Sequence, residues 1–201
     1  MKQGFVTEKT ARIVSSEDER LILVDLDDTE TGVLNKAACH DGDGKLHRAF
    51  SLFLFNAQGD LLLQQRAPGK RLWPRFWSNS CCSHPRQGES LEFAAERRLQ
   101  DELDAQATLE HVYKFSYQAR FQDLGSEHEL CHVFLGILDG DATRNETEIE
   151  ALRFVSATQL EEELQTKQEH FTPWFTMEWA RLNEEFADTL TRYTNPTGLR
   201  G

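Results

Sequence analysis

The sequence predicts an α/β fold of the mixed α+β kind, built around a central sheet. Some segments alternate apolar and polar residues with a period of two, as strands do, and others repeat apolar residues every three or four positions, as helices do. Several predicted strands are separated only by short turn sequences. With 201 residues the chain is long enough for one domain with a hydrophobic core, so we expect residues 1–201 to form a single domain.

The first half of the chain is expected to contain strands joined by turns. Residues 21–26 are mostly apolar and lead into D-D-T-E-T-G, which is typical of a strand followed by a turn. Residues 50–55 and 61–65 flank N-A-Q-G-D and predict a β-hairpin. Residues 66–71, R-A-P-G-K-R, predict a basic loop.

The second half mixes helical and strand patterns. Ser90 precedes a segment with an apolar residue at every fourth position through residue 103, so we expect a helix that Ser90 caps. Residues 113–121 alternate in polarity and residues 130–138 are mostly apolar, so both predict strands. Ser156 can cap a helix through residue 164. Five apolar residues at helical spacing predict a C-terminal amphipathic helix: Phe175, Trp179, Leu182, Phe186 and Leu190.

Composition and charge restrict the function classes. A formal net charge of -12 argues against a nucleic-acid partner, so an anionic substrate would need a locally cationic pocket or a metal. The longest apolar stretch, residues 49–55, is too short to cross a membrane, and the first residues lack the apolar run of a secretion signal. The four cysteines have no C-x-x-C spacing, so we expect free thiols and a cytoplasmic protein.

Residue types that ligate metals are concentrated in three short segments, H-D-G-D-G-K-L-H, S-N-S-C-C-S-H-P and S-E-H-E-L-C. In extended backbone, residues two apart point to the same face, so Cys82 would face one way with His84, and Glu127 with Glu129. Three imidazoles and two carboxylates form a nitrogen and oxygen set that suits a divalent transition metal or Mg²⁺. The candidate ligands are His40, His47, His84, Glu127 and Glu129.

A further pair, Arg98 and Glu102, lies four residues apart on one side of a predicted helix. The carboxylate could hold a hard cation and the guanidinium a phosphate. Taken alone, each feature has a plainer interpretation. An arginine and a glutamate four residues apart usually form a surface ion pair, and histidines in a polar loop are usually not ligands. Alternating glutamates usually mark the solvated face of a strand. A single cysteine is usually a small buried residue. The functional hypothesis depends on all of these features occurring in one order.

That order resembles the type 1 isopentenyl-diphosphate delta-isomerases, which have a Nudix-like fold. The matching segments are L-N-K-A-A-C-H, L-H-R-A-F-S-L-F-L-F-N, Q-Q-R-A-P-G-K, W-P-R-F-W-S-N-S-C-C-S-H-P, G-E-S, E-H-E-L-C and F-T-P-W. The resemblance implies a Nudix-like core over about residues 20–193, with a central mixed sheet flanked by helices. It also implies an isomerase that interconverts isopentenyl diphosphate and dimethylallyl diphosphate in isoprenoid biosynthesis.

Carried over residue by residue, the resemblance places the five candidate ligands in a metal site. It implies catalytic roles for Glu129 and for Cys82 rather than Cys81. Tyr117 would assist the glutamate, and the π-face of Trp174 would stabilise a cationic intermediate. The implied diphosphate-binding cations are Lys36, Arg66, Lys70 and Arg98.

The resemblance also implies cofactors and partners. Mg²⁺ would bind at Glu102. The histidine and glutamate set would bind a second divalent metal, for which Mn²⁺ and Zn²⁺ are the candidates. No flavin is expected. The partner is a small-molecule diphosphate, with no nucleic acid and no membrane, and the protein would be a monomer or a homodimer. Residue chemistry leaves open whether Cys82 or Glu129 protonates the substrate, while the resemblance suggests Glu129 as donor and Cys82 as base.

The Nudix box of this chain departs from the hydrolase pattern R-E-U-x-E-E-x-G-U, in which U is a bulky apolar residue. Residues 97–105 read R-R-L-Q-D-E-L-D-A. Arg98 and Asp101 replace two glutamates, Asp104 replaces the glycine, and an arginine cannot ligate a metal that activates water. The box therefore favours isomerisation over the rival activity of a Nudix hydrolase, and leaves Glu102 as its surviving glutamate.

Two further functional hypotheses have less support in the sequence. L-I-L-V-D-L-D-D-T resembles the nucleophile strand of haloacid-dehalogenase-type phosphatases, with Asp25 as nucleophile and Asp27 as acid, but the later motifs are not convincing and an acidic turn explains the segment more simply. A non-catalytic metal- or diphosphate-binding module would be favoured only if Cys82 were inaccessible. An EF-hand interpretation of D-G-D-G-K-L fails because Lys45 stands where a third ligand belongs.

Overall fold

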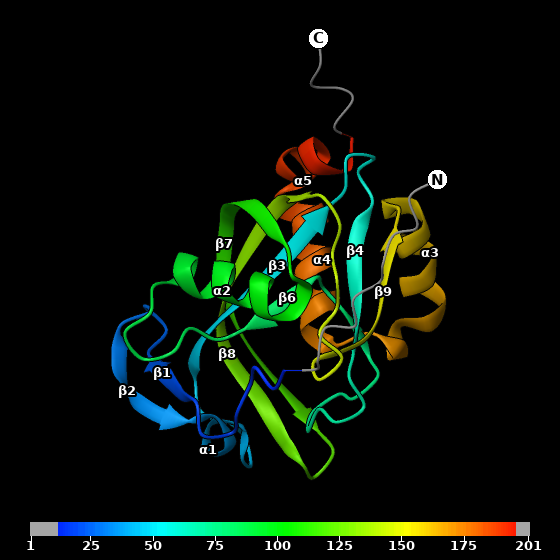
Figure 1. The fold of residues 1–201 in the computed structure, drawn as a ribbon. Coiled ribbons are helices and arrows are strands. Elements are labelled where there is room, and N and C mark those ends of the chain that lie inside the picture. The colour runs from blue at the N-terminus through cyan, green and yellow to red at the C-terminus, as the bar shows by residue number, and fades with distance from the viewer. Residues whose placement is uncertain (1–11, 196–201) are drawn as a thin grey trace.

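The computed structural model describes residues 12–195, which fold around a mixed β-sheet (Figure 1). The strands are β1 (Arg20–Val24), β2 (Glu30–Asn35), β3 (His47–Phe55), β4 (Leu61–Arg66), β5 (Trp77–Ser78), β6 (Cys81–Ser83), β7 (Gln106–Phe121), β8 (Gly125–Asp139) and β9 (Ile149–Val155). The helices are α1 (Lys36–His40), α2 (Leu91–Leu103), α3 (Ala157–Lys167), the 3-10 helix η1 (Gln168–His170), α4 (Pro173–Glu185) and α5 (Ala187–Thr194).

Strand β3 is the centre of the sheet. The main path runs β2-β1-β3-β4-β5, while β6 and β8 also pair with β3, β7 pairs with β8, and β9 pairs with β4. The pairing of β3 with β8 is parallel, and its neighbours β1, β4 and β6 pair with β3 in the antiparallel direction. A strand with neighbours of both directions makes the sheet mixed, and its side chains can meet residues from several distant segments.

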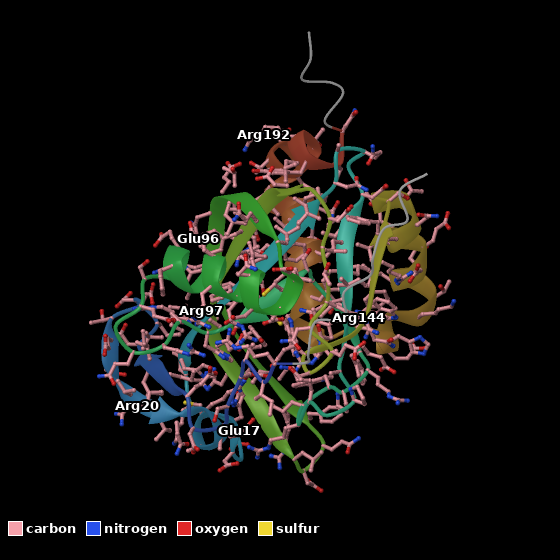
Figure 2. All side chains as sticks on the ribbon, in the orientation of Figure 1. Glu17, Arg20, Glu96, Arg97, Arg144 and Arg192 are labelled. Atoms are coloured by element: carbon pink, nitrogen blue, oxygen red, sulfur yellow. The ribbon has the colours of Figure 1, made fainter. Side chains whose placement is uncertain are left out.

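Helices cover both faces of the sheet. Helix α2 packs Ala95, Leu99 and Leu103 into a buried cluster on one face. Helices α3, α4 and α5 pack against the other face, where their buried residues include Leu160 and Trp179. Figure 1 shows α2 and α4 on opposite sides of the strands. The predicted central mixed sheet flanked by helices is therefore confirmed. Charged residues lie on the surface of the molecule (Figure 2), among them Arg20, Glu96, Arg144 and Arg192.

The predicted hairpin and the two capped helices are also confirmed. Phe55 pairs with Leu61 at the start of the β3–β4 hairpin. The Ser90 hydroxyl accepts a hydrogen bond from the N–H of Phe93 at 3.2 Å, which satisfies one of the open donors at the start of α2. Ser156 begins α3 with a capping box. Local hydrogen bonding and apolar spacing were sufficient to locate these elements.

The prediction of one continuous C-terminal helix is wrong. The chain leaves the helical conformation at Phe186, where φ is -128° and ψ is 28°, and this residue separates α4 from α5. Its ring stacks on Tyr113 with centroids 4.8 Å apart. The apolar spacing continues across the break because both helices pack on the same core, so periodicity alone did not reveal the interruption.

The acidic segment after β1 forms a turn, as the simpler interpretation predicted. The Oδ1 atom of Asp25 accepts hydrogen bonds from the N–H groups of Asp27 at 3.0 Å and Thr29 at 2.9 Å. Asp25 and Asp27 are both exposed. This local turn accounts for the motif without a phosphatase nucleophile.

The histidines of H-D-G-D-G-K-L-H do not lie in a polar loop, which corrects the simpler interpretation of that segment. His40 is the last residue of α1, and His47 is the first residue of β3. Both are buried, and the loop lies between them. The short helix α1 was not predicted because it is five residues long, although Asn35 caps it by accepting from the N–H of Ala38 at 2.9 Å.

Two broader predictions can be compared with the described residues. All four cysteines are free thiols, as expected. No helix between residues 12 and 195 is long and apolar enough to cross a membrane. The expectation about a secretion signal concerns residues 1–11, which lie outside the described part of the chain, as do the last residues of the predicted single domain.

Gly125 holds the start of β8 against the helix that carries His40. Its φ of 146° is available to glycine and strains any other residue. A Cβ atom at this position would lie 2.2 Å from the carbonyl oxygen of His40. Gly42, in contrast, has a φ of 59° and no atom within 4 Å of an added Cβ. Substitution of Gly42 by alanine would therefore introduce backbone strain alone, whereas the same substitution at Gly125 would introduce both strain and steric overlap.

We expect Gly125→Ala to lower the free energy of unfolding by about 3 kcal/mol or more, since backbone strain of about 1–3 kcal/mol adds to displacement of the His40 carbonyl. Gly42→Ala should cost only about 1–2 kcal/mol, because it introduces left-handed strain without overlap. Urea unfolding of both variants measures the difference. Equal losses would show that close packing against His40 does not matter.

Candidate active site

Five side chains predicted as metal ligands come together at one end of the β3–β8 pair. His40 ends α1, His47 begins β3 and His84 follows β6. Glu127 and Glu129 lie on β8, where the parallel register puts Glu129 beside His47. One ligand atom from each residue belongs to a group whose members all lie within 4.8 Å of one another.

Backbone carbonyls orient two of the three imidazoles. The Nδ1 atom of His40 lies 2.7 Å from the carbonyl oxygen of Lys36, and the Nδ1 atom of His47 lies 2.7 Å from that of Lys45. Because a carbonyl oxygen can only accept, each Nδ1 carries the proton when the ring is neutral. The lone pair of each ring is then on Nε2, which is the arrangement found in histidines that bind metals.

The inward-facing atoms form a donor set that needs a cation. His40 Nε2 lies 2.7 Å from Glu127 Oε2, and His84 Nε2 lies 2.9 Å from Glu129 Oε1. The buried Nε2 of His47 has no hydrogen-bond partner among the described residues. Lone pairs that face carboxylate oxygens repel them unless a proton or a metal ion lies between, so these residues fit a divalent metal.

Electrostatics favour the ligating forms of three of these side chains, His47, His84 and Glu127. Burial, with the neighbouring His40, lowers the pKa of His47 to about 4. Burial, with His47 and His40, also holds the pKa of His84 well below its usual range. Burial by itself would raise the pKa of Glu127, but the adjacent His40 outweighs it and the pKa lies at about 2. Neutral imidazoles and an ionised carboxylate are the forms that bind metals.

A cavity beside the metal-ligand cluster gathers nearly all of the other predicted site residues. It shares Lys36, Arg66 and Lys70 with a neighbouring cavity of about 160 Å³. The lining of the first cavity consists of Lys36, His40, Arg66, Lys70, Cys82, Ser83, His84, Arg98, Tyr117, Glu127, Glu129 and Trp174. Two predicted site residues, His47 and Glu102, do not line it.

Cys82 and Glu129 approach the cavity from opposite neighbours of β3. Cys82 lies on β6 and Glu129 on β8, and both strands pair with β3. The hydroxyl of Tyr117 donates to Glu129 Oε2 at 2.7 Å. Trp174 Nε1 donates to the hydroxyl of Ser78 at 3.1 Å, which fixes the plane of the indole ring.

Burial raises the pKa of both reactive side chains. Burial raises the pKa of Cys82 to about 12, against the opposing effect of Arg66, whose Nη1 lies 4.0 Å from the sulfur. Burial and the negative charge of Glu127 raise the pKa of Glu129 well above its usual range. Burial thus favours the protonated form of each group, and Arg66 is the cation that favours the thiolate of Cys82.

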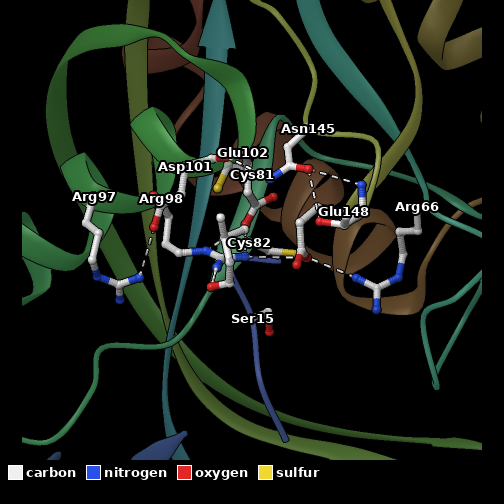
Figure 3. A network of polar contacts seen from close by, with 12 residues as sticks. Ser15, Arg66, Cys81, Cys82, Arg97, Arg98, Asp101, Glu102, Asn145 and Glu148 are labelled. Carbon is white, nitrogen blue, oxygen red and sulfur yellow. Dashed lines mark hydrogen bonds and ion pairs between the residues drawn. The ribbon is translucent and has the colours of Figure 1, made fainter. Parts of the chain in front are cut away.

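The interpretation of Arg98 and Glu102 as an ordinary surface pair is wrong. Each side chain is only 3% exposed, and Arg98 donates to Glu102 Oε1 through its Nε at 2.8 Å. Arg98 also lies 3.5 Å from Glu148, which in turn pairs with Lys70. Figure 3 shows Arg98, Glu102 and Glu148 converging near Cys82. This network puts buried cations next to the cavity.

Sequence reasoning missed two buried carboxylates. Glu148 pairs with Lys70 and Arg98, but it is the middle one of three alternating glutamates in residues 146–150, and nothing in that run distinguishes it. Glu178 is fully buried, and burial raises its pKa to about 8. Its position four residues after Trp174, within the apolar stripe of α4, was a usable signal.

Known proteins share this fold. A model of the NUDIX domain matches residues 45–175. A crystal structure of a protein from Deinococcus radiodurans superposes with a TM-score of 0.60 at 22% identity, covering 74% of this chain and 90% of that one. A MutT protein from Methanosarcina mazei Go1 gives a TM-score of 0.55 at 16% identity, over 70% of this chain and 96% of that one. The fold is that of a Nudix domain.

Sequence relatives define the family within that fold. The chain is 41% identical to "Isopentenyl-diphosphate Delta-isomerase 1" of Photorhabdus laumondii, over 86% of this chain and 99% of the relative. It is 46% identical to "Isopentenyl-diphosphate Delta-isomerase" of Serratia proteamaculans, over 79% of this chain and 88% of the relative. The chain belongs to the isopentenyl-diphosphate Delta-isomerase family.

We expect removal of one imidazole to release the metal. His84→Ala should weaken the binding of Mn²⁺ or Zn²⁺ by at least about 100-fold, since loss of even an outer partner of a metal ligand costs about 10–100-fold. His128→Ala is the matched control, because His128 lies on β8 between the two glutamates and outside the ligand cluster. Calorimetric titration of metal-free protein measures both. Equal affinities for the two variants would exclude His84 as a ligand.

Proposed function

We propose that this chain interconverts isopentenyl diphosphate and dimethylallyl diphosphate by paired proton transfers at Cys82 and Glu129. The observation that carries the proposal is the cavity in which these two side chains meet Tyr117 and Trp174. Membership of the isopentenyl-diphosphate Delta-isomerase family supports the same reaction. We place the isomerase unit at about residues 20–193.

The diphosphate end of the substrate is assigned to the cationic side of the cavity. Lys36, Arg66, Lys70 and Arg98 all line it. A guanidinium binds phosphate oxygens in pairs, and an ammonium adds a compact charge. These local cations oppose the repulsion expected from a chain with a net charge of -12.

Two metal sites are assigned. The histidine and glutamate cluster would hold a divalent transition metal, with Mn²⁺ or Zn²⁺ as candidates, or Mg²⁺. A metal there supplies a positive charge that tunes the proton affinity of the carboxyl of Glu129. Glu102 would hold a Mg²⁺ shared with the diphosphate, next to Arg98.

The reaction needs one proton added to the terminal alkene carbon and one removed from the carbon on the other side of the double bond. Glu129 is assigned as the acid, because it lines the cavity and its Oε2 already accepts from the Tyr117 hydroxyl, which can pass a proton to it. Cys82 is assigned as the base, with Arg66 favouring its thiolate. Cys82 can accept this proton only as the thiolate, so the reaction starts from the Cys82 thiolate and protonated Glu129. The substrate gains one proton from Glu129 and loses one to Cys82, and a proton then passes through solvent from Cys82 back to Glu129 before the next turnover.

Trp174 is assigned to stabilise the tertiary cation formed between the two transfers. A nucleophile near that cation would trap it, whereas a π-face attracts positive charge without forming a bond. The indole is 3% exposed and lines the cavity, and the guanidinium of Arg66 already lies 5.3 Å from its ring centre. The ring therefore faces positive charge in this structure.

The experiment that tests the function is incubation with isopentenyl diphosphate and a divalent metal in deuterated water. An isomerase places deuterium from solvent into dimethylallyl diphosphate, which mass spectrometry detects. A Nudix hydrolase would instead release phosphate and leave the alkene unchanged. Phosphate release without deuterated product would reject the proposal.

We expect Cys82→Ala to abolish isomerisation and Cys81→Ala to retain it. Cys82 lines the cavity, whereas Cys81 is fully buried in the cluster under α2, so its loss should lower stability by about 1–2 kcal/mol through lost packing. Turnover per folded molecule, with folded fraction from a thermal melt, separates the two effects. Equal loss of turnover in two well-folded variants would overturn the assignment of Cys82.

We expect Trp174→Phe to keep part of the activity and Trp174→Leu to lose about tenfold in turnover. A desolvated cation–π contact contributes roughly 1–2 kcal/mol to the cationic transition state, and about 1.4 kcal/mol corresponds to a factor of ten. Both variants lose the hydrogen bond to Ser78. Equal turnover of the Phe and Leu variants, with reduced melting temperature in both, would leave Trp174 only a packing role.

A further inference from the structure

Residues 12–16, here called the N-terminal segment, run along the cationic side of the cavity. Lys36 Nζ donates to the hydroxyl of Ser15 at 2.6 Å, and Arg98 Nη1 donates to the carbonyl oxygen of Val14 at 2.9 Å. Ser15 also lines the cavity of about 160 Å³ that adjoins the reactive cavity. Figure 3 shows Ser15 close to the network that contains Arg98 and Glu148.

The segment is fixed in place by bonds to its backbone carbonyls. The carbonyl oxygen of Arg12 accepts from Asn145 Nδ2 at 2.8 Å and from the hydroxyl of Thr147 at 3.2 Å. Val14 is buried with 8% exposure, and its carbonyl also accepts from Arg86 at 3.5 Å. Side chains from three distant parts of the chain thus anchor the residues that precede Ser15.

Of the two cations that this segment touches, Arg98 pairs with Glu102, whereas Lys36 has no ion-pair partner within residues 12–195. Lys36, Lys70 and Arg98 line the same cavity, so their like charges repel one another. Glu148 pairs with Lys70 and approaches Arg98, whereas the ammonium of Lys36 donates to the neutral hydroxyl of Ser15. A phosphate oxygen next to Lys36 would relieve this repulsion.

We propose that Ser15 is a further diphosphate-binding residue and that the N-terminal segment forms the outer wall of the diphosphate site. The inference rests on the proposed position of the diphosphate among the four cations. A hydroxyl accepts and donates at once. The oxygen of Ser15 accepts from Lys36, and its O–H is the donor for a phosphate oxygen at the same place. The Val14 carbonyl accepts from Arg98 Nη1, while Nε and Nη2 of the same guanidinium donate to Glu102, so the segment helps to fix Arg98 in place beside the site.

The test measures affinity separately from chemistry. In Ser15→Ala we expect KM for isopentenyl diphosphate and Kd for inorganic pyrophosphate to rise together, by roughly tenfold, because a hydrogen bond to a charged group is lost. The expected change in kcat is less than about twofold, because Ser15 lies among the cations and away from Cys82 and Glu129. Ser15→Thr keeps the hydroxyl and should restore both constants.

Ser16→Ala is the matched control. Ser16 is exposed, and its hydroxyl accepts only from the N–H of Asp18 at 3.2 Å within the described chain, so its loss should leave KM and Kd at wild-type values. Unchanged constants in Ser15→Ala would overturn the proposal. Tighter pyrophosphate binding would also overturn it, because the segment would then block the site.

Lys36→Ala separates failure of this inference from failure of the proposed function. If Lys36→Ala weakens pyrophosphate binding while Ser15→Ala does not, the diphosphate position holds and only the role of Ser15 is rejected. If Lys36→Ala leaves pyrophosphate binding unchanged, the assigned diphosphate position is itself wrong, and the inference about Ser15 is rejected with it.

Discussion

The parallel pairing of β3 with β8 is the constraint on which the rest of the site depends. It sets His47 beside Glu129, and the two-residue period of a strand then puts Glu127 on the same face. A slip of one residue would turn both carboxylates to the other face and leave the imidazoles without oxygen partners. The other edge of β3 pairs with β6, where Ser51 lies opposite Cys82. Pairing with β3 therefore places the candidate metal ligands of β8 and the thiol of β6 around a single cavity.

Burial makes this arrangement both costly and specific. Arg98, Glu102 and Glu148 are each at most 4% exposed, and a buried charge is tolerated only when it is paired. Each has an opposite charge in contact, yet the ammonium of Lys36 next to them donates to the neutral hydroxyl of Ser15. The protein therefore keeps a locally cationic cavity inside an acidic molecule, and a diphosphate would supply the missing negative charge.

The sequence predicted correctly those features that depend on interactions between residues close together in the chain. The cap at Ser90 and the hairpin after β3 follow from hydrogen bonding within a few residues, and the ordered motifs predicted which side chains meet in the cavity. The break at Phe186 could not be predicted, because apolar spacing continues through it and the ring stacks on Tyr113, 73 positions earlier in the numbering. Glu148 and Ser15 gain their roles only from partners distant in sequence, so no neighbouring residue marks them.

The altered box explains how a Nudix fold can leave hydrolysis behind. Asp104 adopts φ 49° and ψ 40°, the left-handed conformation that the glycine of the hydrolase pattern would favour, so the helix end survives the substitution. The change at Arg98 is different in kind. Where the pattern has a carboxylate, α2 presents a guanidinium that donates to Glu102 and to the Val14 carbonyl. A guanidinium has no lone pair for a metal, so Arg98 cannot help to hold a metal that activates water, and its proposed role is to bind the diphosphate. The larger set of candidate metal ligands lies on α1, on β3, on β8 and just after β6, and the proposed proton donor, Glu129, belongs to that set.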